Sequence, residues 1–158
     1  MNEEEFDELD LEEYNVNDVV VGTHENINEE LCGTIVTLER GYVETRLTTS
    51  SEMVADSIGL IHGGFIFSAA DYAAMLAVNE RNVVLVASDC QFLSPVKFHD
   101  EVNFIAKVRH KEGRKRNVHV EGFVFDIKVF EGEFKTVVTE RHVLKLKLLD
   151  EDNEALGN

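Results

Sequence analysis

The stretch LIHGGFIFSAADYAAMLAVN, residues 60–79, decides the fold. Between residues 63 and 79 its apolar side chains cover every face of a helix, and its Ala, Met and Leu residues favour that conformation. A helix that is apolar all round is buried rather than exposed on one side. The stretch therefore predicts a buried central helix that carries one unexplained carboxylate, Asp71.

Strand patterns flank this helix on both sides. The runs TIVTLER (34–40) and YVETRLTT (42–49) are separated by Gly41 and predict an antiparallel hairpin. Residues 50–61 have no clean period and are interpreted as a loop. After the helix the apolar period becomes two, which is the period of a half-buried strand. Four further strands are expected, at 83–96, 101–110, 117–130 and 134–149.

Two details of the later strands follow from the same alternation. The apolar positions within 117–130 change parity around Gly122, as a bulge or a sharp bend would produce. Near the end of the chain the alternation places Leu144, Leu146 and Leu148 on one face and Lys145 and Lys147 on the other. The last strand is therefore expected to continue to residue 149.

One sheet and one buried helix have a simple packing solution. An antiparallel sheet of about six strands curls around the helix, which predicts an α+β fold. A helix wrapped on one side would still expose apolar surface, so we expect an oligomer that covers the remainder. At 158 residues the chain suits one domain, which we place at residues 31–149.

The net charge of −16 belongs to the ends of the chain and not to its body. Residues 1–30 hold twelve acidic and no basic residues, residues 150–154 hold four acidic residues, and residues 31–149 hold fifteen of each sign. A neutral body argues against nucleic-acid binding. We interpret 1–30 as an acidic extension that is a solvated tail to about residue 18, or alternatively a short docking helix, and 150–158 as a second acidic tail.

Membrane and redox roles are not expected. No window approaches the roughly 18 consecutive apolar residues of a membrane span, and the acidic N-terminus does not resemble a signal peptide. A cytoplasmic location is therefore expected. The two cysteines, Cys32 and Cys90, form neither a disulfide framework nor a CxxC motif, so no metal or redox use is expected.

Two motifs occur in the order and spacing of a known family. In IHGGFIFSAADYAAMLA (61–77) an acid follows the His by nine residues, and DCQFLSPVKFHDEVNFIAKV (89–108) contains a strand, an FL-P turn and a DE-A strand start. Residues 33–148 thereby resemble the hotdog-fold acyl-CoA thioesterases, most closely the phenylacetic-acid-degradation type. The resemblance implies an acyl-CoA substrate, no cofactor beyond the coenzyme A of that substrate, and a homodimer that pairs into a dimer of dimers.

The chemistry of the first motif agrees with this resemblance. The first N–H groups of a helix have no intrahelical partner, so the amides at Gly63 and Gly64 form a ready anion site. A thioester carbonyl develops negative charge during attack, which such donors stabilise. We expect Gly64 to be the oxyanion donor and Gly63 to contact the substrate. A simple joint between loop and helix is the alternative.

Asp71 is the expected catalytic carboxylate. Its helix neighbours at three and four residues include no cation, so a buried Asp71 must be protonated, hydrogen-bonded to another element or open to a ligand cavity. In the resembling family the equivalent acid acts as a general base on water or as a nucleophile. An Asp that hydrogen-bonds across a dimer interface is the structural alternative. The resemblance also places His62 beside the helix start, in an orienting or a chemical role.

Asp56 departs from the family pattern. Thioesterases of this kind commonly carry Asn or Gln six residues before the His, where an amide holds the attacking water or the carbonyl. A carboxylate there could repel Asp71 and raise the pKa of one of the two acids. We therefore include Asp56 among the expected site residues and expect it to weaken hydrolysis.

The remaining expected residues bind the substrate. The basic turn EGRKRN, residues 112–117, supplies cations for the phosphates of coenzyme A, or is merely a solvated turn. By analogy with the family, an acyl chamber is expected between the helix and residues 83–96. The expected contacts are Lys111, Arg114, Lys115 and Arg116 in the basic turn, and Phe65, Met75, Val86, Ser88 and Phe92 in the chamber.

Hydrolysis of an acyl-CoA or aryl-CoA thioester is the leading functional hypothesis. The alternative is an acyl-CoA binding or sensing module that acts through a protein partner, because residues 1–33 are acidic and too short for a DNA-binding helix-turn-helix. The hydratase branch of the same fold requires a catalytic Asp and His at its own spacing, which the sequence does not contain.

Overall fold

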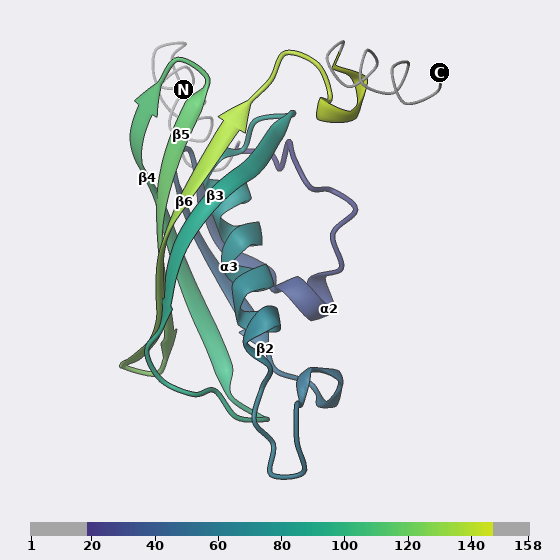
Figure 1. Ribbon diagram of the computed structural model, residues 1–158, viewed down its shortest axis with the longest axis vertical. Coiled ribbons are helices and arrows are strands. Elements are labelled where there is room, and N and C mark those ends of the chain that lie inside the picture. The colour runs from purple at the N-terminus through teal and green to yellow at the C-terminus, as the bar shows by residue number, and fades with distance from the viewer. Residues whose placement is uncertain (1–18, 147–158) are drawn as a thin grey trace, which may run out of the picture.

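The computed structural model describes residues 19–146, and Figure 1 shows how its elements follow one another. A short helix precedes a hairpin, a long helix follows, and four strands complete the sheet. The elements are α2 (Glu29–Cys32), β1 (Thr34–Glu39), β2 (Tyr42–Thr48), η1 (Ser51–Met53), α3 (Gly63–Val78), β3 (Val83–Phe92), β4 (Glu101–Glu112), β5 (Lys115–Val124), β6 (Ile127–Val138) and η2 (Val143–Lys145).

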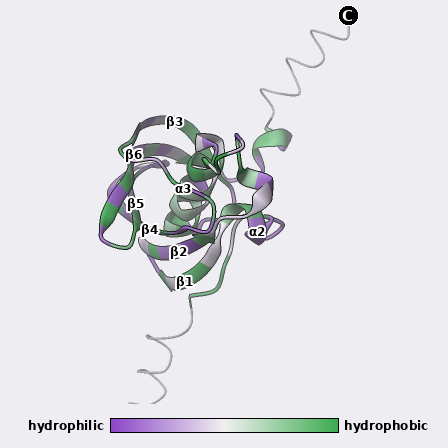
Figure 2. Cartoon of the chain, turned by 90° about the horizontal axis from the view of Figure 1, so that it is seen from below, coloured by the Kyte–Doolittle hydropathy of each residue, from purple (hydrophilic) through white to green (hydrophobic). Residues whose placement is uncertain are grey.

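The six strands form one antiparallel sheet in the order β1-β2-β4-β5-β6-β3. Seen end-on, they make an arc that partly encloses α3, and α2 lies on the open side of that arc (Figure 2). Helix α3 contacts all six strands. The predicted α+β architecture is therefore confirmed, with β1 and β3 as the two edges of the sheet.

The core lies between α3 and the concave face of the sheet. Phe104 of β4 and Phe130 and Phe134 of β6 are fully buried there. Phe67 of α3 stacks on Phe134 with 5.7 Å between ring centroids. Burial of each such side chain stabilises the fold by about 1.5–3 kcal/mol, so these rings hold the helix in place on the sheet.

Asn79 ends α3 and anchors the segment that precedes α2. Its backbone is left-handed, with φ 49°, and its N–H donates to the Met75 carbonyl. Its side-chain Oδ1 accepts from the Gly22 N–H at 2.8 Å, and its Nδ2 donates to the Val20 carbonyl at 2.9 Å. Asn79 therefore caps α3 and also holds residues 20–22, near the start of the described chain, against the C-terminal end of this helix.

Three local predictions are confirmed. The first hairpin turns at Gly41, whose φ of +80° suits glycine. The buried helix runs from Gly63 to Val78, with Asn79 as its cap. The pairing of β5 with β6 shifts between Gly122 and Phe123, where a bulge or bend was expected.

The predicted bounds of the last two strands are wrong. A tight turn at Phe125 and Asp126 divides residues 117–130 between β5 and β6, which pair as a hairpin. Strand β6 then runs through 131–133, where a break was expected, and ends at Val138. Leu144 and Lys145, expected in the last strand, lie in η2. Phe125 is 92% exposed with a φ of 54°, a conformation that Gly or Asn ordinarily marks in a sequence.

Some predictions lie outside the described residues. These are the acidic tail at 1–18, the tail at 150–158 and the end of the expected last strand, with Lys147 and Leu148. Within the described part of the chain, no helix combines the length and apolar character needed to traverse a lipid bilayer. The domain bounds 31–149 and the cytoplasmic location remain predictions.

Candidate active site

The start of α3 presents free backbone donors beside an imidazole. His62 is the N-cap residue, and Gly63 and Gly64 are the first residues of the helix, so their amides have no intrahelical acceptor. A Cβ on Gly64 would stand only 3.1 Å from both Cδ2 and Nε2 of His62, so the ring lies directly against this glycine. The His62 ring also meets Phe65 edge-on, with 6.2 Å between centroids. The expected helix-start residues are therefore neighbours.

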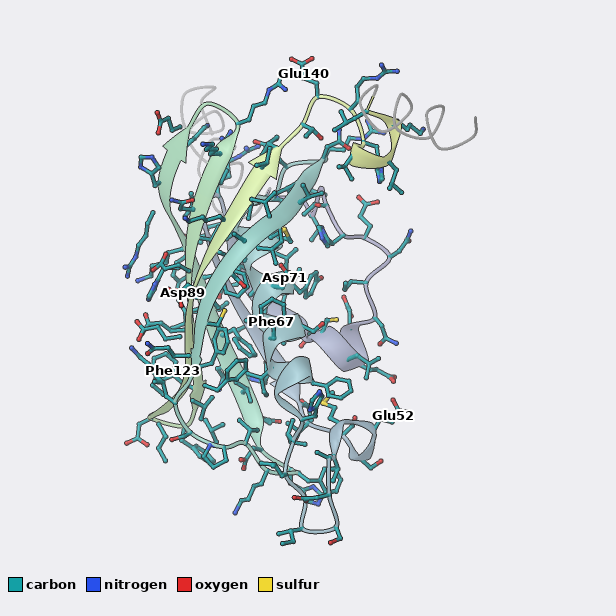
Figure 3. All side chains as sticks on the ribbon, viewed as in Figure 1. Glu52, Phe67, Asp71, Asp89, Phe123 and Glu140 are labelled. Atoms are coloured by element: carbon teal, nitrogen blue, oxygen red, sulfur yellow. The ribbon has the colours of Figure 1, made fainter. Side chains whose placement is uncertain are left out.

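Asp71 lies two turns further along α3, on the same face as Gly64. Figure 3 shows Asp71 and Phe67 on successive turns of the helix. The carboxylate atom Oδ1 of Asp71 is buried and has no hydrogen-bond partner among residues 19–146. Burial raises the pKa of Asp71 to about 6, because a charged carboxylate is poorly solvated there. This is the arrangement that a carboxylate aimed at a ligand would have.

Edge strand β3 runs beside Asp71. Every second residue of this part of β3 points to the inner face of the sheet. These residues are Ser88, Cys90 and Phe92, which pair with Phe134, Gly132 and Phe130 of β6. Burial is the main cause that raises the pKa of the Cys90 thiol, and the Asp89 and Asp71 carboxylates add to it. The expected residue Ser88 is therefore on the strand that faces Asp71.

A small apolar pocket of about 200 Å³ opens between the start of α3 and the end of β3. Of the side chains expected in an acyl chamber, Phe92 lines this pocket, whereas Met75 lies in the core and Val86 is 59% exposed. The sequence interpretation missed most of the lining, although the FLSPV run of the second motif pointed to part of it. The lining residues are Ile61, Gly63, Ile66, Phe92, Ser94, Pro95, Val96 and Val129.

Asp56 has a local structural role. Its Oδ1 accepts hydrogen bonds from the amides of Leu60, Gly59 and Ile58 at 3.1, 2.9 and 2.9 Å. These bonds, with that from Leu60 first, lower the pKa of its exposed carboxylate. Burial, and not a second carboxylate, is what raises the pKa of Asp71. The repulsion expected between Asp56 and Asp71 is therefore not a feature of the single chain.

The basic turn lies far from the helix start within one chain. The turn between β4 and β5 is at the end of the sheet opposite the start of α3 (Figure 1). Arg114 pairs with Glu140 at 3.4 Å. Arg116 donates from Nη1 to the carbonyls of Gly113 and Lys115, at 2.7 and 3.1 Å. Lys111 pairs with Arg116 in the β4-β5 ladder. One chain alone does not bring these cations to the Gly64 amide.

Comparisons with known proteins point to one family. The family model described as the thioesterase superfamily matches residues 58–131. The acyl-coenzyme A thioesterase PaaI of Escherichia coli is 31% identical over 109 residues, which cover 68% of this chain and 72% of that protein. A methylthioribose-1-phosphate isomerase of Aquifex aeolicus is 54% identical over 117 residues, 74% of this chain. The chain spans only 26% of that isomerase.

Solved structures share the fold. An uncharacterized protein of Pyrococcus horikoshii is 42% identical, with a TM-score of 0.79 over 80% of this chain and 98% of that one. A Streptococcus mutans protein bound to acetyl CoA is 22% identical, with a TM-score of 0.67 over 75% of this chain and 97% of that one. At that identity the second likeness concerns the fold alone.

The raised pKa of Asp71 predicts a pH-dependent gain in stability for Asp71→Asn. Folding shifts this pKa upward, so the folded chain binds more protons than the unfolded chain between about pH 4 and pH 6, and the wild type loses stability as the pH rises through that window. The Asn variant lacks this penalty and should be more stable by about 1–3 kcal/mol above pH 7. Urea unfolding at pH 5 and pH 8 measures the difference, and a gain that does not grow with pH contradicts the assignment.

Proposed function

Because the chain belongs to the thioesterase superfamily, we propose that it hydrolyses an acyl-CoA or aryl-CoA thioester to a free acid and coenzyme A. The single observation that carries the proposal is the buried Oδ1 of Asp71, which lacks a hydrogen-bond partner in the described chain and shares a helix face with Gly64. An unpaired buried carboxylate is costly to keep, so its presence favours a functional role. Similarity to PaaI supports the reaction class.

In the proposed mechanism the start of α3 holds the thioester carbonyl. The carbonyl oxygen accepts from the Gly64 N–H, and the positive end of the helix dipole stabilises the negative charge that develops on it. His62 lies against Gly64 and orients the thioester there. The acyl group enters the apolar pocket beside Gly63 and Phe92.

Asp71 activates water instead of attacking the carbonyl carbon itself. Asp71 comes seven positions after Gly64, so their Cα atoms are about 10 Å apart along the helix axis. Direct attack requires reacting atoms about 3–3.5 Å apart, so we assign Asp71 to a water molecule placed between its carboxylate and the carbonyl carbon and not to attack on the carbon itself. Asp71 accepts a proton from this water as hydroxide adds to the carbon. The C–S bond then breaks, and the thiolate leaves readily because a thiol has a pKa of about 8.5.

Replacement of Asp71 by Asn should abolish most of the turnover. General-base catalysis contributes about 10²–10⁴-fold, so kcat should fall at least about 100-fold while KM changes little. Wild-type kcat/KM should rise with pH and level off above about pH 6, where Asp71 is ionised. Thiol release from a panel of acyl-CoA and aryl-CoA thioesters measures both effects.

Asp56→Asn is the matched control. Asn can accept the same loop hydrogen bonds, so this variant should keep wild-type turnover and the wild-type pH profile. If no thioester of the panel is hydrolysed by folded wild-type protein, hydrolysis is excluded. Thermal stabilisation by acyl-CoA without turnover would then select the alternative, a binding module.

The basic turn is proposed to hold the phosphates of coenzyme A. The double variant Arg114→Ala, Lys115→Ala should raise KM for the CoA thioester about tenfold, equivalent to about 1.4 kcal/mol of lost binding. The matching thioester of N-acetylcysteamine has the same reacting group without phosphates, and its KM should not change. Steady-state kinetics with both substrates tests this. Equal changes for the two substrates would contradict a phosphate contact.

We propose that a second copy of the chain brings the basic turn to the helix start, with edge strand β3 as the dimer interface. This strand has ten residues, one edge that pairs with no other strand of residues 19–146, and two exposed apolar side chains, Val86 at 59% and Phe92 at 54%. A long apolar edge is ordinarily covered, because its unpaired backbone groups can pair with another strand. The homodimer and its pairing into a dimer of dimers remain proposals.

Val86→Lys should dissociate the homodimer. A lysine on an edge strand opposes pairing with another strand, and Val86 is the bulged residue of β3. Val36→Lys is the matched control, because Val36 is half-exposed and occupies the bulge of β1 at the opposite edge. Light scattering coupled to gel filtration gives the mass of each variant. A monomeric wild type, or dissociation by Val36→Lys instead, contradicts the proposed interface.

A further inference from the structure

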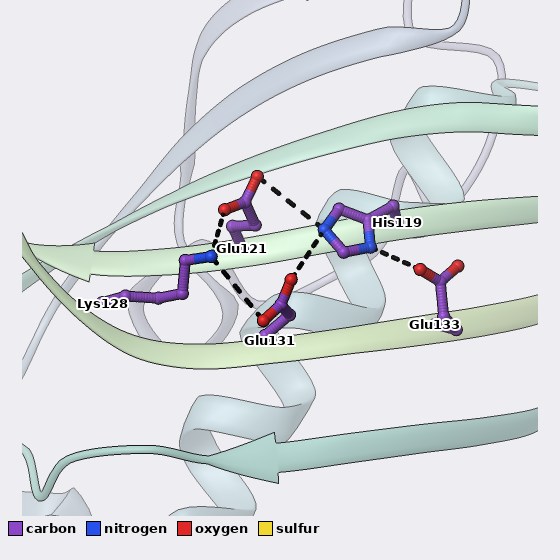
Figure 4. Close-up of polar contacts among 5 residues, drawn as sticks. All are labelled: His119, Glu121, Lys128, Glu131 and Glu133. Carbon is purple, nitrogen blue, oxygen red and sulfur yellow. Dashed lines mark hydrogen bonds and ion pairs between the residues drawn. The ribbon is translucent and has the colours of Figure 1, made fainter.

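A histidine surrounded by carboxylates lies on the outer face of the sheet, away from α3. His119 and Glu121 of β5 pair with Glu133 and Glu131 of β6 across the hairpin. Because Val118 and Val120 point into the core, the residues that alternate with them point to the opposite face. Figure 4 shows these four side chains together with Lys128. The proposed hydrolysis uses none of them.

The contacts of the His119 ring fix where its hydrogen resides. The side chain is only 9% exposed, and Nδ1 is hydrogen-bonded to Oε1 of Glu133. An ionised carboxylate can only accept, so Nδ1 carries the hydrogen. In the neutral ring Nε2 then presents a lone pair. Nε2 makes no hydrogen bond within residues 19–146, although Oε1 of Glu131 and Oε1 of Glu121 lie 3.2 and 3.8 Å from it.

Lys128 neutralises only the outer part of the cluster. Its ammonium lies 2.7 Å from Oε2 of Glu121 and 3.6 Å from Oε2 of Glu131. Each of these carboxylates therefore directs one oxygen to Lys128 and the other to His119. The inner atoms, Nε2 and the two Oε1 oxygens, all carry lone pairs and lie within 4.8 Å of one another. Such a set is electrostatically unfavourable unless a cation stands among its atoms or Nε2 itself takes up a proton.

We propose that His119, Glu121 and Glu131 bind a divalent transition-metal cation, with Zn²⁺ as the best match. Zinc binds imidazole nitrogen at about 2.0–2.1 Å and carboxylate oxygen at about 2.0–2.2 Å, which places neighbouring ligand atoms about 3–3.5 Å apart. The spacings of 3.2 and 3.8 Å are close to that range. One nitrogen and two oxygens suit zinc better than calcium or magnesium, which prefer oxygen alone.

Glu133 has the role of a positioning residue at this site. A metal-binding histidine ordinarily donates its other ring N–H to a carboxylate, which fixes the ring and aims the free nitrogen at the metal. The hydrogen bond from His119 Nδ1 to Glu133 is that arrangement. Asp89 and Gln91 of β3 pair with Glu133 and Glu131 at the open side of the cluster, where water can complete the coordination.

Titration of metal-free full-length protein with Zn²⁺ in a calorimeter tests the proposal. The wild type should bind Zn²⁺ at a site that His119→Gln weakens at least about tenfold and Glu133→Gln weakens about 10–100-fold. Lys128→Gln should tighten binding, because it removes a competing cation from Glu121 and Glu131. Mg²⁺ should bind more weakly than Zn²⁺ to the wild type.

His110→Gln is the matched control. His110 lies on β4 beside Glu112, at 3.4 Å, but is exposed and pairs with one carboxylate only among the described residues. This variant should keep wild-type affinity, and Zn²⁺ should raise its thermal unfolding midpoint as it does for the wild type but not for His119→Gln. If His119→Gln does not fold, Glu131→Gln replaces it. Absence of Zn²⁺ binding by the wild type, or equal binding by His119→Gln or Glu131→Gln, overturns the proposal, and neither result bears on thioester hydrolysis.

Discussion

The rest of the structure depends on the burial of one helix that has no polar face. Helix α3 is apolar in all directions, and the arc of six strands covers it on one side while α2 lies on the other. Phe67, Phe130 and Phe134 lock the helix to the sheet. Because rotation of the helix would break the stack of Phe67 on Phe134, the positions of its first amides and of Asp71 are fixed relative to β3.

The same burial gives Asp71 its chemistry. No cation or hydrogen-bond donor compensates its Oδ1 in the described chain, so desolvation alone moves its pKa to about 6. That value is close to neutral pH, where a carboxylate is still ionised and is a stronger base than an exposed one. The fold thus loses some stability at the position where a general base is useful, which is the usual relation between stability and active-site chemistry.

The sequence was sufficient for the helix, the first hairpin and the strand count, because strong periodicity and Gly41 marked them. The sequence did not predict turns that lack a typical turn residue such as Gly or Asn. Phe125 adopts a left-handed conformation that its side chain does not predict, so the β5-β6 turn was missed. Without that turn, the sequence could not predict that His119 pairs with Glu133. The structural role of Asp56 was missed for a different reason. Its side chain accepts hydrogen bonds from three backbone amides, and these depend on a loop geometry that a family pattern does not encode.

The β5-β6 hairpin links the two faces of the sheet through its register. Gly132 faces inward, where a Cβ would stand 2.8 Å from the Cys90 sulfur, and its neighbours Glu131 and Glu133 face outward to His119. A slip of one residue would exchange the faces, turning the carboxylates into the core and exposing Phe130. Both the core and the outer polar cluster therefore favour one register. The strand that positions β3 beside Asp71 is held by interactions on either side of the sheet.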